Sequence, residues 1–115
     1  MRFQLLWVII GLVTISCSWD NAEELYGKED CPPDGVSYSQ TIEPIIKSNC
    51  AVSGCHINGQ QGPTLETYGQ ISANAERILA RTSNGTMPPA ISGNSLTQTQ
   101  IDEIACWVND GAMDN

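Results

Sequence analysis

The compact part of this chain has few large apolar side chains with which to build a core. Between Val36 and Asn115 the aromatic residues are Tyr38, Tyr68 and Trp107. No segment here alternates apolar and polar residues with period two, whereas apolar residues recur at helical spacing in several places. Short helices rarely bury enough apolar area to stand alone at this size. We therefore expect an all-α domain whose core is completed by disulfides, a metal or a large apolar cofactor.

The apolar spacing predicts three helices in this domain. The first covers about 41–49, and the second covers about 67–81. The third is indicated most clearly, because Thr97 and Gln100 have the spacing of a capping box, and Gly111 is placed to end the helix. We expect one domain that spans 36–115 and contains these three helices.

The start of the chain has the pattern of an export signal. Arg2 precedes an unbroken apolar run over 5–13 that is too short to span a bilayer and is typical of a signal peptide. Residues 14–17, Thr-Ile-Ser-Cys, resemble a bacterial lipobox, which implies a signal peptide over 1–16 and lipidation of Cys17. We expect an exported membrane lipoprotein that faces the periplasm or the cell surface. The alternative is an ordinary cleaved signal in which Cys17 has no role.

Charge restricts the partners of this chain. The formal net charge is −8, and residues 17–35 form an acidic segment that we interpret as a tether between the lipid anchor and the domain. An acidic surface argues against nucleic acid, whose phosphates require Lys and Arg. It also argues against electrostatic binding to anionic lipid, so the lipid anchor is the only membrane attachment that we expect.

The segment 50-CAVSGCH-56 gathers two thiols and the single histidine of the chain within seven residues. A zinc site is disfavoured, because the neighbours Cys55 and His56 reach one tetrahedral metal only with difficulty. A disulfide between Cys50 and Cys55 is possible and would leave His56 without a role. Covalent haem attachment uses all three residues, because two cysteines add to the haem vinyl groups and the following histidine ligates iron.

Taken together, this motif and two other segments resemble the small class I cytochrome c domain of bacterial lipoproteins. The resemblance covers about 36–112 and includes VSYSQTIEPIIKSNC before the motif, the loop GTMPPA over 85–90 and the final segment IDEIACWVNDGA over 101–112. It implies a small helical domain folded around covalently bound haem c.

The resemblance also implies roles for individual residues. Cys50 and Cys55 would form the thioether links to haem, His56 would be one axial ligand of the iron, and Met87 would be the other. Met87 is also the only methionine inside the domain, because Met1 departs with the signal and the remaining one lies in the tail. The family usually has two residues between its cysteines, whereas this chain has four, so attachment through one cysteine remains an alternative.

Two of the five cysteines are then left over. With Cys17 assigned to lipid and two cysteines assigned to haem, Cys31 and Cys106 are expected to form a disulfide in an oxidising compartment. The helical pattern points Cys106 away from the apolar face of its helix, so this bridge would lie across the outside of the domain. The alternative is a pair of unpaired buried thiols.

The expected function is electron transfer by a monohaem, iron-binding and therefore metal-binding domain with His and Met as axial ligands. We expect an electron carrier with an unidentified redox partner protein, or an accessory subunit of an oxidoreductase, and not an enzyme in its own right. The alternative is a haem-free surface lipoprotein that acts as a binding module and is stapled by Cys50–Cys55 and Cys31–Cys106 disulfides. Arg77 and Arg81, one helical turn apart, could meet haem propionates, but the pattern favours a solvated helix face.

Overall fold

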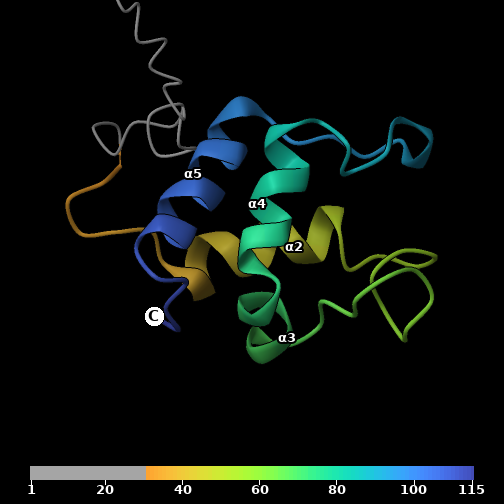
Figure 1. Ribbon diagram of the computed structural model, residues 1–115, viewed down its shortest axis with the longest axis horizontal. Coiled ribbons are helices and arrows are strands. Elements are labelled where there is room, and N and C mark those ends of the chain that lie inside the picture. The colour runs from red at the N-terminus through yellow and green to blue at the C-terminus, as the bar shows by residue number, and fades with distance from the viewer. Residues whose placement is uncertain (1–30) are drawn as a thin grey trace, which may run out of the picture.

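The computed structural model describes residues 31–115, and these residues are helical with no strand among them (Figure 1). The expectation of an all-α domain is therefore confirmed. The signal peptide, Cys17 and most of the predicted tether lie outside the described residues. Within residues 31–115 no helix is long and apolar enough to cross a membrane. The elements are the π-helical turn η2 (Tyr38–Ile42), α2 (Glu43–Asn49), α3 (Tyr68–Ala73), α4 (Ala75–Ser83), the 3-10 turn η3 (Ala90–Ser92) and α5 (Gln98–Asn109).

The first helical segment begins earlier than predicted. Ser37 is its N-cap and accepts a hydrogen bond from the backbone N–H of Gln40 at 3.3 Å. Pro44 lies in the first turn of α2 and has no N–H with which to continue an α-helical ladder. The turn before it has the wider π-helical pattern. The predicted segment 41–49 is thus extended by η2, which carries the buried Tyr38 into the core.

The predicted helix over 67–81 is two helices, α3 and α4, which meet at Asn74. The amide of Asn74 donates a hydrogen bond from Nδ2 to the carbonyl of Gln70 at 2.8 Å. In a continuous helix this carbonyl would accept the backbone N–H of Asn74. The side chain of Asn74 therefore replaces a helical hydrogen bond, which allows the chain to break.

The final helix, α5, has the predicted start and end. The Thr97 hydroxyl accepts the backbone N–H of Gln100 at 3.2 Å, and the Gln100 side chain accepts the backbone N–H of Thr97 at 2.9 Å. Two residues after the helix ends, Gly111 has a φ of +97°, a conformation that favours glycine. The capping box predicted from the sequence is confirmed.

The aromatic residues of the domain pack on one another. Tyr38 makes an edge-to-face contact with Tyr68, with ring centroids 5.0 Å apart, and its ring centroid is 5.8 Å from that of Trp107. Trp107 is 1% exposed, and its indole N–H donates to the carbonyl of Met113 at 2.9 Å. This aromatic cluster joins η2, α3 and α5. Trp107 therefore lies at the centre of the core.

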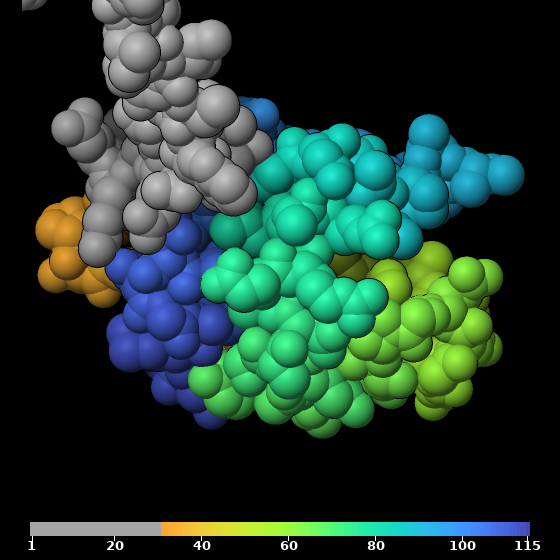
Figure 2. Space-filling view, in the orientation of Figure 1, coloured from red at the N-terminus to blue at the C-terminus, as the bar shows by residue number. Residues whose placement is uncertain are grey.

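A disulfide joins Cys31 to Cys106, as predicted, with 5.5 Å between the two Cα atoms. Cys106 is 6% exposed and belongs to the core cluster, against which Cys31 is packed. The expectation that Cys106 lies outside the core is therefore wrong. Figure 1 shows residues 31–37 at one end of the domain, beside α5, and the loops after α2 and α4 at the other end. In Figure 2 these two loops form separate projections on one side of the molecule.

Removal of the disulfide should destabilise the domain substantially. The bridge connects residues separated by 75 positions. Closing so long a loop lowers the entropy of the unfolded chain and is worth about 4 kcal/mol in the chain-entropy model. We expect the variant Cys31→Ala with Cys106→Ala to lose stability of this order in urea unfolding. Reductant should lower the stability of the wild type and leave that of the variant unchanged; equal stability of the two oxidised proteins would contradict the prediction.

Candidate functional site

A cavity of about 510 Å³ lies between three parts of the chain: the loop that follows α2, the side of α4, and the loop that follows α4. Its volume is within the range of roughly 300–1,000 Å³ that is typical of cofactor and small-molecule sites. Cys50, Cys55, His56 and Met87 all line it. The structure thus brings together all four residues that the sequence predicts for a haem site. Tyr68 and Trp107 do not line the cavity, because the aromatic cluster packs at a distance from it.

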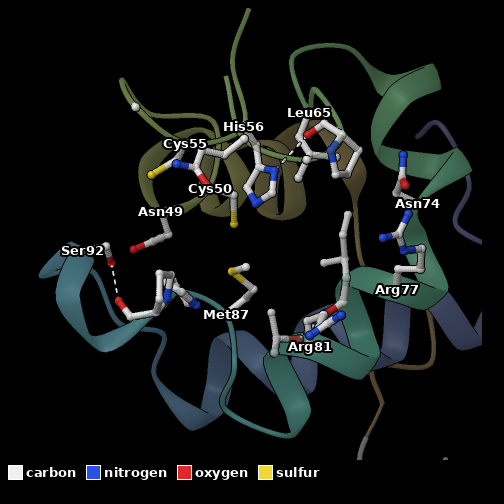
Figure 3. A pocket seen from close by; sticks show the side chains of 18 of the residues that line it. Asn49, Cys50, Cys55, His56, Leu65, Asn74, Arg77, Arg81, Met87 and Ser92 are labelled. Atoms are coloured by element: carbon white, nitrogen blue, oxygen red, sulfur yellow. Dashed lines mark hydrogen bonds between the residues drawn. The ribbon is translucent and has the colours of Figure 1, made fainter. Parts of the chain in front are cut away.

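The ring of His56 is held by the loop in which it lies. Its Nδ1 is 2.9 Å from the carbonyl oxygen of Pro63, and because a carbonyl can only accept, Nδ1 carries the proton of this hydrogen bond. In the neutral ring Nε2 is then unprotonated and free to act as a ligand. Figure 3 shows the imidazole directed into the cavity. The chain passes so close that a Cβ atom at Gly62 would lie 3.4 Å from the Cε1 atom of His56.

A tight turn at the end of α4 positions Met87. The carbonyl of Arg81 accepts the backbone N–H groups of Thr86 and Met87, each at 3.0 Å. The side chain of Asn84 accepts the hydroxyl of Thr86 at 2.7 Å and its N–H at 3.0 Å, and Gly85 takes a φ of +70° between them. In Figure 3 the Met87 side chain reaches into the cavity from the side opposite to His56, and the two side chains point toward one another.

The two cysteines of the motif are free thiols in different surroundings. Cys50, the C-cap of α2, is 8% exposed, and its sulfur points into the cavity (Figure 3). Burial, reinforced by the nearby Cys55, raises the pKa of the Cys50 thiol from 9.0 to about 11. Cys55 is half-buried at the edge of the cavity, and its sulfur points away from His56. The disulfide between Cys50 and Cys55 that the alternative reading expects is absent from this structure.

The expectation of iron and metal binding needs a correction. Within residues 31–115 there is no group of three or more His, Cys, Asp or Glu side chains that could hold a metal ion. A site in which protein side chains alone bind iron or another metal is therefore contradicted, and the zinc alternative fails with it. The geometric reason is visible at Cys55, whose sulfur is directed away from the neighbouring imidazole. What the cavity offers is two facing neutral donors, the imidazole of His56 and the thioether of Met87.

Sequence reasoning missed the groups that support these side chains. The carbonyl of Pro63 and the closeness of Gly62 to the imidazole could not be read from residue types, because both depend on the path of the loop. The pair Asn84-Gly85 is common in turns and therefore predicts a turn before Met87. The pair does not by itself show that this turn directs Met87 into the cavity. Arg77 and Arg81 are exposed, as the pattern favoured, and they also line the cavity.

Comparisons with known proteins identify no relative. A scan against protein-family models, a search of curated proteins and a search of solved structures each find no match to this chain. Any assignment of function therefore depends on the residues of the cavity.

The buried thiol of Cys50 should make the stability of the haem-free domain fall at alkaline pH. The unfolded chain loses this proton near pH 9, whereas the folded state retains it until about pH 11. Because the folded state then binds more protons, stability decreases across this window and levels off above it. Between pH 8 and 11 the wild type should lose about 2 kcal/mol more than Cys50→Ala.

Urea unfolding at several pH values, without oxygen or reductant, measures this difference. Burial, with a smaller effect of Glu43, also raises the pKa of Tyr38. Tyr38 is present in both proteins, so its contribution cancels in the comparison. Parallel stability curves for the wild type and Cys50→Ala would contradict the burial of an un-ionised thiol.

Proposed function

We propose that this chain is an electron carrier, a monohaem c-type cytochrome domain with Cys50 and Cys55 as attachment points and His56 and Met87 as axial ligands. The observation that supports this function best is the meeting of these four side chains at one cavity of about 510 Å³. The expected haem-binding role follows from the resemblance of the motif. The position of the two donors on opposite sides of the cavity gives it a geometric basis.

The lining of the cavity fits a large apolar ring. Leu65 and Ile78 form buried parts of the wall, and Pro88 lies beside Met87 at its edge. Met87 is 36% exposed and Ile91 is 97% exposed, and both line the cavity. Filling the cavity with an apolar group would remove part of this surface from water, which is favourable. Such a group would also supply the apolar contacts that the three aromatic residues do not provide at this end of the domain.

When bound, haem would supply one-electron transfer between the ferrous and ferric states, and with His56 and Met87 as its ligands it would have no vacant position for a substrate. The residues of the chain prepare the two ligands. The hydrogen bond to Pro63 places the proton of the neutral imidazole on Nδ1, so that Nε2 of His56 is the atom available as a ligand, and the Arg81 carbonyl fixes the backbone of Met87. A thioether ligand favours the ferrous state and raises the reduction potential relative to a second histidine.

The alternative function, a haem-free binding module held by two disulfides, has less support. The Cys31–Cys106 bridge is present, but Cys50 and Cys55 are both free thiols. That function also leaves the alignment of His56 and Met87 without a purpose. We propose that the chain is a lipid-anchored protein located outside the cytoplasm, and the disulfide is compatible with this location. The redox partner would be another protein, and a role as accessory subunit of an oxidoreductase changes only that partner.

Covalent attachment should depend on both cysteines of the motif. When the chain is produced in a bacterial periplasm with haem-ligation machinery, intact mass should show one added haem. Cys50→Ala and Cys55→Ala should each retain haem through one remaining thioether, and the double variant should lose all haem on denaturing extraction. The proposed function would be overturned if the wild-type chain carried no haem and its mass were that of the reduced chain less the two hydrogens of one disulfide.

Met87 should set the potential of the haem-loaded domain. Met87→Ala opens one axial position, so we expect a lower reduction potential and binding of added imidazole or carbon monoxide. Axial ligands tune haem potentials over a range of roughly 0.8 V, so the shift should be easily resolved by redox titration. Met113→Ala is the matched control, because Met113 is 54% exposed and does not line the cavity. An equal potential in the two variants would exclude Met87 as a ligand.

A further inference from the structure

The cationic side chains of this acidic domain differ in whether they form an ion pair. The described residues include three of the five Lys and Arg residues of the chain: Lys47, Arg77 and Arg81. Lys47 forms an ion pair with Glu43 at 2.7 Å on the surface of α2. Among residues 31–115, neither arginine has an ion-pair partner. Both arginines are exposed, and in a chain whose net charge is −8 they can bind an added anion without first breaking an ion pair.

Both arginines line the cavity, and no Asp or Glu among the described residues does. They lie one helical turn apart on α4, a spacing at which like charges repel each other. An anionic group between them would relieve this repulsion. The cavity wall is thus positively charged, although the domain around it is acidic.

The arginines lie on a different side of the cavity from Cys55. In Figure 3 Arg77 and Arg81 extend from α4 on one side, and Cys55 lies on the other, with His56 and Met87 between them. The porphyrin of haem has its two vinyl groups on one edge and its two propionate groups on the opposite edge. A haem joined to Cys55 through a vinyl carbon would therefore direct its propionates toward α4.

We propose that Arg77 and Arg81 bind the two propionate carboxylates of the haem, an inference that rests on the proposed function. The planar guanidinium group matches a carboxylate in shape and can donate two parallel hydrogen bonds to it. Two arginines and two carboxylates also balance in charge. Both arginines are exposed, as the sequence pattern favours, so the carboxylates would be bound at a solvent-exposed part of the cavity wall. In this arrangement α4, which carries both arginines, would determine the orientation of the haem within the cavity.

The test compares two proteins. One is a double variant that carries both Arg77→Gln and Arg81→Gln, and the other is the control variant Lys47→Gln. Covalent haem content should stay at the wild-type level, because attachment depends on the cysteines. The reduction potential of the double variant should fall below that of Lys47→Gln, because uncompensated carboxylates near the iron favour the ferric state. The double variant Arg77→Lys with Arg81→Lys should restore most of the difference. A double glutamine variant with the potential of Lys47→Gln would overturn the inference.

A second measurement requires no variant. NMR titration of the haem-loaded wild type follows the propionate methylene signals as the pH falls. Paired with arginine, these carboxyl groups should titrate below the ordinary carboxyl pKa of about 4.3. Titration at or above that value would overturn the inference even if the glutamine variant failed to fold. A wild-type chain that takes up no haem would instead overturn the proposed function itself.

Discussion

The packing of Trp107 against Tyr38 is the contact around which this domain is organised. It joins α5 to η2, and Tyr68 adds α3 to the same cluster, with its hydroxyl donating to the carbonyl of Ala112 at 2.8 Å. All the aromatic side chains between Val36 and Asn115 are thereby concentrated at one end of the domain. None of these three aromatic residues lines the cavity, which lies at the other end, between the loops that follow α2 and α4. The aromatic cluster thus completes the core and leaves the cavity to be lined by other side chains.

Each of the two candidate ligands is positioned by a backbone hydrogen bond to a carbonyl group near the end of a helix. The last carbonyl groups of a helix have no partner within the helix and must be satisfied by other groups. The carbonyl of Cys50, at the end of α2, accepts the N–H of His56 at 3.1 Å, and the carbonyl of Arg81, near the end of α4, accepts the N–H of Met87. In both cases a loop returns to a helix end and delivers a side chain to the cavity. The positions of His56 and Met87 therefore depend on backbone hydrogen bonds and not on neighbouring side chains alone.

Local patterns predicted the parts of this structure that local physics determines. The capping box at Thr97 depends on residues three positions apart, and the disulfide partner of Cys31 followed from counting cysteines. The break between α3 and α4 was missed, because it depends on one Asn74 side chain competing with the backbone within an otherwise helical pattern. The burial of Cys106 was missed because the segment that covers it comes from 75 positions away. The members of the candidate site were predicted from residue type, whereas their orientation depends on loops that no spacing rule describes.

The disulfide also determines how the domain responds to mechanical force. Cys31 precedes η2 in the chain, and it is bonded directly to Cys106 in the last turn of α5. Tension on the N-terminal side is therefore transmitted through sulfur to α5 and does not pass along residues 32–37. The loops that carry His56 and Met87 lie at the far end of the molecule, outside this path (Figure 1). A pull on the chain before Cys31 is thus borne by the disulfide and not by the contacts of η2 with the core.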